Sequence, residues 1–146
     1  MDKRRILNLI KDQDKWKLEG IFTILDTPNE KGLIYETNSF SYNAGKIKGK
    51  LLNERITGEL NHPSYDEIKD ENATHYINDI YYDSTDKTIK GSIILLDNER
   101  GKSVKQMIDD SGLPYVSFRG LGYMDSYYIN KFILSELITY DLFIKR

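Results

Sequence analysis

The first half of the chain shows two different spacings of hydrophobic residues. Ile6, Leu9 and Ile10 are spaced as one face of a helix, which predicts a short helix from residue 2 to about residue 13. From Trp16 to Leu25, apolar and polar residues alternate as they do in a strand with one buried face. Further along, the pattern predicts a turn at 27–32, a helix at about 44–54 and a brief strand at 56–60.

The second half reads mainly as strands. Residues 63–72 are polar and predict an exposed loop, and Ser103 is expected to cap a helix that reaches about Asp110. Two strands are expected to pair as an antiparallel hairpin, at 74–83 and 88–96. The remaining pattern predicts a strand end with a glycine-rich turn at 116–122, a turn at 125–126, and strands at 127–133 and 137–144.

These elements amount to about six strands and three short helices without regular alternation of strand and helix. The predicted class is therefore α+β, built on a small antiparallel β-barrel or a strongly curved sheet flanked by short helices. The 146 residues suit one domain, residues 1–146, with one hydrophobic core.

Composition narrows the function classes. The formal net charge of −2 gives no reason to expect a nucleic-acid or membrane-surface partner, and no apolar run approaches the length of about 20 residues that spans a bilayer. The N-terminus lacks the long apolar segment of a secretory signal. The absence of cysteine excludes disulfides and a thiol nucleophile, and it makes a reducing cytoplasm the expected compartment.

Two separated segments carry the candidate chemistry. Gly58-Glu59-Leu60-Asn61-His62-Pro63 places one of only two histidines before a proline, which favours extended geometry at the histidine. Val116-Ser117-Phe118-Arg119-Gly120-Leu121-Gly122 places a serine before a glycine-rich stretch, where backbone N–H groups can face a developing oxyanion. Brought together by folding, these segments predict His62 as general base and Ser117 as nucleophile of a serine hydrolase.

The same residues also have simpler interpretations than a serine hydrolase. Ser117 can be a strand-end hydroxyl bonded to its own turn, and His62 can be a structural histidine. A metal-dependent hydrolase would need His62, His75 and carboxylates as ligands, but no His-x-x-His or Glu-x-x-His spacing supports such a site. The acidic loop at 66–71 lacks an EF-hand pattern. We therefore expect neither a metal nor another cofactor.

The two segments, in their order and separation, resemble the paired signature of tailed-phage prohead core (maturation) proteases of the T-even type, which are related in fold to herpesvirus assemblin. Glu19-Gly20-Ile21-Phe22 and Asp79-Ile80-Tyr81-Tyr82 are similar to two further segments of that family. The resemblance covers residues from about 16 to 143. Phe118 departs from it, because the family often has a second serine there.

The resemblance implies a serine endopeptidase with a small barrel surrounded by helices, active in the host cytoplasm inside the assembling prohead. Its substrates would be the phage scaffold or core proteins and the major capsid protein, cut after glutamate in an apolar-x-Glu context. The resemblance is also compatible with a homo-oligomer. A catalytically silent homologue that serves as a structural core or scaffold component is the alternative. Retention of both His62 and Ser117 favours activity.

Matching positions make Ser117 the nucleophile and His62 its base. Family members carry an acid on a late apolar strand, and Tyr140-Asp141-Leu142-Phe143 resembles that strand, so Asp141 would orient His62. Assemblins use a second histidine instead, which makes His75 the alternative third member. Arg119 and Gly120 lie in the matching motif and are the expected oxyanion or substrate-binding residues, although Arg119 can also simply pair with a surface carboxylate.

Overall fold

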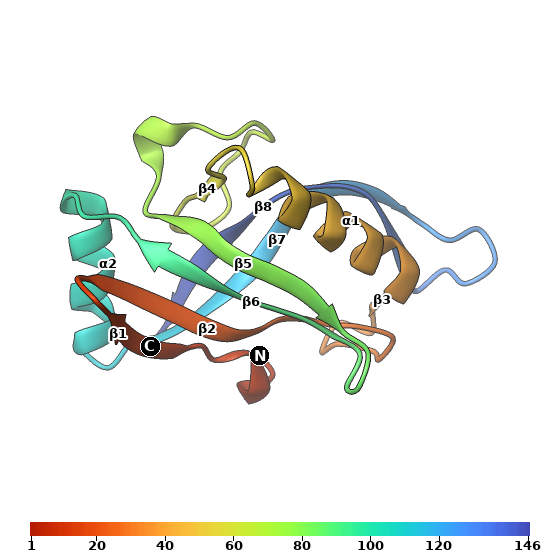
Figure 1. Ribbon diagram of the computed structural model, residues 1–146. Coiled ribbons are helices and arrows are strands. Elements are labelled where there is room, and N and C mark those ends of the chain that lie inside the picture. The colour runs from red at the N-terminus through yellow and green to blue at the C-terminus, as the bar shows by residue number, and fades with distance from the viewer.

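The computed structural model describes residues 1–146, which form two β-sheets and two α-helices (Figure 1). The strands are β1 (Asn8–Asp12), β2 (Lys15–Ile24), β3 (Ile34–Tyr35), β4 (Thr57–Gly58), β5 (His75–Asp83), β6 (Thr88–Leu95), β7 (Leu113–Met124) and β8 (Lys131–Lys145). One sheet has the order β1-β2-β6-β5-β4 and the other has the order β3-β8-β7. Every pairing is antiparallel except that between β3 and β8. The α+β class is confirmed, but the hydrogen bonding forms two sheets and not a closed barrel.

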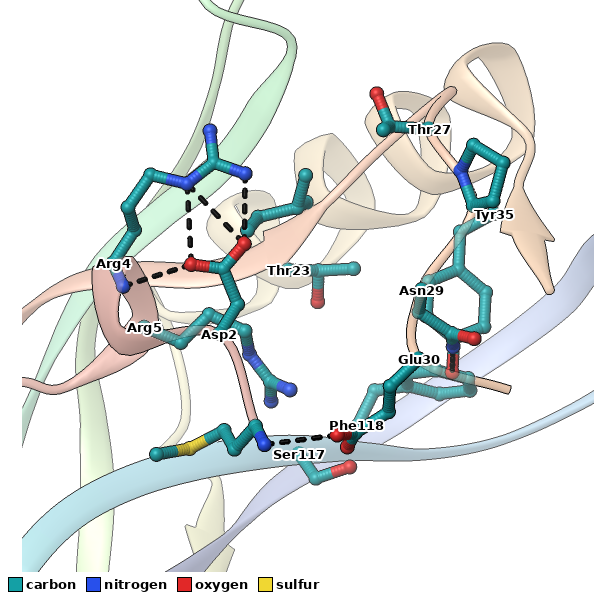
Figure 2. Close-up of a pocket in the computed structure, with 13 residues that line it drawn as sticks. Asp2, Arg4, Arg5, Thr23, Thr27, Asn29, Glu30, Tyr35, Ser117 and Phe118 are labelled. Carbon is teal, nitrogen blue, oxygen red and sulfur yellow. Dashed lines mark hydrogen bonds and ion pairs between the residues drawn. The ribbon is translucent and has the colours of Figure 1, made fainter. Parts of the chain in front are cut away.

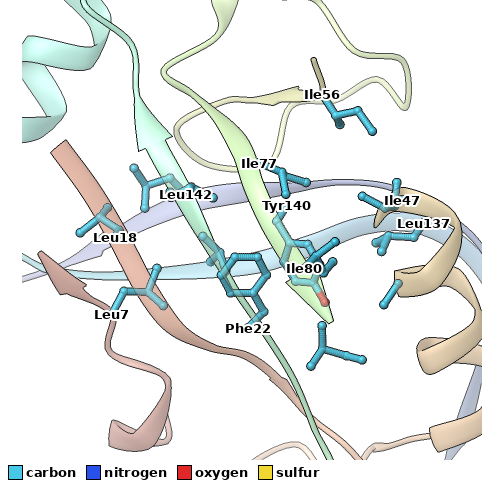
Figure 3. Close-up of a cluster of buried hydrophobic side chains, with 14 of the residues drawn as sticks. Leu7, Leu18, Phe22, Ile47, Ile56, Ile77, Ile80, Leu137, Tyr140 and Leu142 are labelled. Atoms are coloured by element: carbon cyan, nitrogen blue, oxygen red, sulfur yellow. The ribbon is translucent and has the colours of Figure 1, made fainter. Parts of the chain in front are cut away.

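The two sheets and the first helix enclose one hydrophobic cluster (Figure 3). Helix α1 (Thr37–Lys50) packs on β5 and β8, and helix α2 (Glu99–Asp109) lies beside β6. In the centre of the cluster, the rings of Phe22 and Tyr140 lie 4.8 Å apart, and the Tyr140 hydroxyl is 2.6 Å from Thr23 Oγ1. This buried contact joins β2 of the five-stranded sheet to β8 of the three-stranded sheet. Neither α-helix has the length and apolar character that a membrane-spanning helix needs.

The predicted N-terminal helix is wrong. Asp2 accepts a hydrogen bond from Arg4 N and caps a single 3-10 turn at Lys3–Arg5, after which β1 pairs with β2. Leu7, just before the strand, is buried and Leu9 is partly buried, whereas Ile10 on the opposite face is more exposed. The inward residues are thus Leu7 and Leu9, at strand spacing, and three apolar residues are too few to establish a helical period.

The other helices begin earlier than predicted. Helix α1 starts at Thr37 and not at about 44, because the Glu36 carboxylate accepts a 2.6 Å hydrogen bond from Ser39 N. Helix α2 starts at Glu99, capped by Asn98 and not by Ser103. Glutamate is an uncommon N-cap residue, so the start of α1 cannot be predicted from the sequence by its cap.

The last two predicted strands are one strand, β8, and the predicted glycine-rich turn lies inside β7. Residues 125–130 form the turn of a long β7–β8 hairpin, held by Asp125 Oδ1, which accepts from Tyr127 N and Tyr128 N. Gly120 lies at a register shift where a Cβ atom would collide with the Glu136 carbonyl oxygen. The glycine therefore permits close approach of two strands and does not end one.

Several sequence predictions are confirmed. Strand β2, the β5–β6 hairpin and the turn at 27–32 lie where the pattern put them. Asn29 organises that turn by accepting hydrogen bonds from Lys31 N and Leu33 N.

We predict that Asn98→Ala lowers the free energy of unfolding by about 1 kcal/mol, because Gly101 N loses its cap. Ser103→Ala is the matched control. Ser103 is exposed within the helix, so its change should stay within about 0.5 kcal/mol. Urea unfolding followed by circular dichroism measures both variants. Equal losses would show that Asn98 is not the cap that matters.

Candidate active site

His62 is positioned by a segment that crosses from one sheet to the other. Gly58 in β4 pairs with His75 in β5, and the chain then leaves that sheet and bonds to β8. Leu142 N donates to Glu59 O over 2.8 Å, and Asn61 N donates to Leu142 O over 2.8 Å. A Cβ atom at Gly58 would collide with the Tyr140 carbonyl oxygen, so this crossing requires glycine. As a result, His62 lies at the edge of β8.

The His62 ring contacts two residues of β8. Its Nδ1 lies 2.9 Å from Asp141 Oδ2, and its ring packs edge-on against Phe143 with centroids 4.9 Å apart. The His62 side chain is 40% exposed, whereas Asp141 is fully buried. An ionised carboxylate only accepts hydrogen bonds, so Nδ1 carries a proton, and in the neutral ring Nε2 then has the free lone pair. This is the tautomer that a general base needs.

Four donors surround the Asp141 carboxylate. Oδ1 accepts from Glu59 N at 3.0 Å and from Arg119 Nη2 at 2.8 Å, while Oδ2 accepts from Arg119 Nε at 2.9 Å and from His62. Burial by itself would raise the pKa of Asp141, but the hydrogen bonds from His62, Arg119 and the Glu59 N–H hold that pKa below its ordinary value. Asp141 is therefore an ionised, fully bonded carboxylate.

Ser117 lies directly opposite Asp141 in the β7–β8 ladder. Opposite residues of an antiparallel pair place their side chains on the same face, so the Ser117 hydroxyl shares the face of the Asp141–His62 pair. Ser117 is half-buried, and no hydrogen bond joins its hydroxyl to His62 in this structure. Catalytic hydrogen bonds are often long in the absence of substrate and tighten when it binds.

Arg119 follows Ser117 by two residues and is turned inward. Its guanidinium forms a two-pronged ion pair with Asp141, and its Nη1 donates to the Glu67 carbonyl over 2.8 Å. The side chain is 7% exposed. The guanidinium is thus paired with a carboxylate, but Asp141 is buried and is not the surface partner that the simpler interpretation of the sequence expects.

Gly120 lies in β7 at the first register shift. Its close contact with the Glu136 carbonyl explains the absence of a side chain there. A role for its N–H in oxyanion binding stays a prediction.

A contact between Glu59 and Tyr65, which the sequence does not indicate, also belongs to this region. The Tyr65 hydroxyl lies 2.8 and 2.7 Å from the two Glu59 carboxylate oxygens and also accepts from Asn72 Nδ2 at 2.9 Å. These bonds attach the loop that follows His62 to the segment that precedes it. Glu59 stands in the same short segment as His62, but nothing in the sequence indicates that Tyr65 folds back onto it.

His75 lies apart from this group and is fully buried. Its Nε2 donates to Tyr140 O over 2.8 Å, and its Nδ1 lies 2.7 Å from Thr74 Oγ1. Burial lowers the pKa of His75 to about 4, so the ring is neutral near pH 7. Its bonds are those of a structural histidine that joins β5 to β8.

A pocket of about 330 Å³ opens along β7 beside Ser117 and Phe118 (Figure 2). The N-terminal turn contributes Arg5, whose guanidinium donates to Val116 O, and Tyr35 supplies an aromatic wall against Phe118. The pocket thus adjoins the strand that carries the candidate nucleophile. No group of three His, Asp or Glu side chains is arranged to hold a metal ion.

We predict that His75 makes the stability of the protein depend on pH. Its folded pKa of about 4 lies below the ordinary 6.5, so this contribution is fully present above pH 6.5 and is lost as the pH falls toward 4. The free energy of unfolding should fall by about 2 kcal/mol from pH 7 to pH 5 through this residue. His75→Gln, whose amide can still donate to Tyr140 O, should remove that fall. Urea titrations of both proteins at the two pH values measure it, and an equal fall in each would refute the assignment.

Comparison with known proteins gives a family and a similar fold. Residues 9–145 match the family described as prohead core protein serine protease. The fold is similar to the solved structure of the bacteriophage T4 capsid assembly protease, gp21, with a TM-score of 0.78 and 20% sequence identity over 94% of this chain and 89% of that chain. Comparison with curated protein sequences gives no match. With nearly its whole length matched, this chain belongs to the prohead core protein serine protease family.

Proposed function

We propose that this protein is a serine endopeptidase that cuts scaffold or core proteins and the capsid protein during phage head maturation, with Ser117 as nucleophile, His62 as general base and Asp141 as orienting acid. One observation carries the proposal. The Asp141 carboxylate bonds to His62 Nδ1 at 2.9 Å and is also the cross-strand partner of Ser117. One buried side chain therefore relates the candidate base to the candidate nucleophile.

The chemistry follows from this arrangement. With Nδ1–H donated to Asp141, His62 Nε2 can take the proton of the Ser117 hydroxyl as its oxygen attacks a peptide carbonyl carbon. The imidazolium then gives that proton to the leaving amine, and a water molecule releases the acyl group by the same two steps. The His62 side chain is 40% exposed, so substrate and water can approach the ring.

The biological setting comes from the family and from the T4 structure. A prohead core protease acts within an assembling capsid, and the T4 protein of similar fold is a capsid assembly protease. By analogy, the substrates of this chain are the scaffold and capsid proteins of its own phage, and its place of action is the prohead interior within the host cell.

We predict that Ser117→Ala and His62→Ala each lower the cleavage rate at least about 1,000-fold while the protein stays folded, and that the double variant loses little more. The losses should not add because base and nucleophile act as one unit. Cleavage of the cognate scaffold protein, followed by gel and mass spectrometry, measures the rate. Ser135→Ala, an exposed serine on β8, is the control that should keep wild-type activity.

Two results would count against the proposal. A Ser117→Ala protein that cuts as fast as the wild type would exclude the serine mechanism. A wild-type protein that cuts neither scaffold nor capsid protein would favour the silent structural homologue.

We predict that Asp141→Asn lowers turnover at least about 100-fold, because the amide no longer selects the productive His62 tautomer. It should also lower the free energy of unfolding by about 3 kcal/mol, because the buried Arg119 loses its counter-charge. His75→Gln should change turnover far less. Initial rates at a temperature where all variants are folded give the ranking. If His75→Gln were the more damaging change, the third member would be a histidine, as in assemblins.

A further inference from the structure

The Arg119 guanidinium contacts the active-site carboxylate and the loop that follows His62 at the same time. Nε and Nη2 donate to the two oxygens of Asp141 at 2.9 and 2.8 Å, and Nη1 donates to Glu67 O at 2.8 Å. A planar guanidinium fixes the plane of a carboxylate that it binds with two prongs. The direction in which Asp141 Oδ2 faces His62 is therefore set by Arg119.

The same contact changes the charge that His62 meets. In a Ser-His-Asp triad, the carboxylate both orients the imidazole and stabilises the imidazolium by its negative charge. Here a full positive charge lies within 2.9 Å of that carboxylate, in a buried position where screening by water is weak. The lone pair of Oδ2 still accepts the His62 N–H, but the guanidinium opposes the attraction between carboxylate and imidazolium.

We propose that Arg119 is a positioning residue with two effects on His62: it orients the Asp141 carboxylate, and its positive charge offsets the negative charge that the carboxylate presents to the imidazole. This inference rests on the proposed function, because it gives Arg119 and Asp141 a task in proton transfer by His62. It differs from oxyanion or substrate binding, since Arg119 acts only through Asp141.

The other charged groups near His62 show that Arg119 is the main positive charge opposing its neighbouring carboxylates. Glu59 Oε2 lies 3.9 Å from Arg119 Nη2, so one cation faces two carboxylates. The titratable groups that contact the ring, or contact its immediate neighbours, come from several elements. They are Asp141 on β8, Tyr115 and Arg119 on β7, Glu59 before the ring, Tyr65, Asp66, Glu67 and Lys69 after it, and Arg5 of the N-terminal turn over Tyr115. Only Arg119 among them is a cation bonded to Asp141. Its loss would leave Asp141 and Glu59 unopposed, and both would favour imidazolium.

The test measures the protonation of His62 directly, in the folded protein. The chain has two histidines, so the NMR ring signals can be assigned with His75→Gln, and the titration midpoint of His62 can be followed against pH. Arg119→Gln removes the charge, and Arg119→Lys keeps the charge but lacks the planar fork. Arg100→Gln, which removes an exposed arginine of α2, is the control for the change in net charge.

We expect Arg119→Gln to move the His62 midpoint upward by about one pH unit, and Arg100→Gln to leave it in place. Arg119→Lys should keep the midpoint close to the wild-type value but lower kcat about tenfold with little change in KM, because the carboxylate is held less well. If Arg119 had only a structural role, both variants would lower the folded fraction, and their His62 midpoints would not differ. An unchanged midpoint in Arg119→Gln, or an equal rise in Arg119→Lys, would overturn the proposal.

A second comparison covers the case in which Arg119→Gln does not fold. Asp141→Asn leaves a buried cation unpaired, whereas the double variant Arg119→Gln/Asp141→Asn leaves neither charge. We expect the double variant to unfold at a higher urea concentration than Asp141→Asn, and an equal or lower midpoint would overturn the proposal. The NMR titration and the unfolding experiment need no peptidase activity. Failure of the serine mechanism would therefore appear in the Ser117→Ala assay and would be distinguishable from failure of this inference.

Discussion

The burial of the Asp141 charge is the constraint on which the site depends. An ionised carboxylate that is fully removed from water is strongly unfavourable unless its oxygens are bonded and its charge is opposed. The donors come from three parts of the chain: the backbone before His62, the His62 ring itself and the Arg119 side chain on β7. The carboxylate is satisfied only when all three are in place, so the stability of this region and the geometry of the site have the same origin.

The backbone arrangement explains how these parts meet. Opposite β7, the edge of β8 pairs with β3 only at Lys131 and Phe132, and Glu59–Asn61 bonds to the same edge further along, at Leu142. Asp141 therefore lies between the histidine segment and the serine strand β7. His75 supports the same strand from the five-stranded sheet through its bond to Tyr140 O. The second histidine thus contributes to the framework beneath the site and has no contact with the candidate nucleophile in this structure.

The sequence predicts part of this site for clear physical reasons. Ser117 and His62 stand in short distinctive segments, and Asp141 is an acid on an otherwise apolar strand, which is a position that demands a partner. The two-pronged contact with Arg119 and the link between Glu59 and Tyr65 depend on strand register and on the path of a loop. The register of β7 and β8 shifts at two bulges, which no pattern of period two can locate. The fold likewise has predictable and unpredictable parts. The alternation of apolar and polar residues predicts β2 and the β5–β6 hairpin, whereas the start of α1 depends on a glutamate cap.

The most direct test of the account is covalent labelling of the folded protein with a serine-directed peptidyl phosphonate that carries glutamate at the reactive position. The adduct is located by mass spectrometry after digestion. We expect one adduct per chain, on Ser117, formed at a rate that falls sharply in His62→Ala. A protein that forms no adduct, that reacts at another serine, or that labels equally fast without His62 would contradict the assignment of the nucleophile and its base.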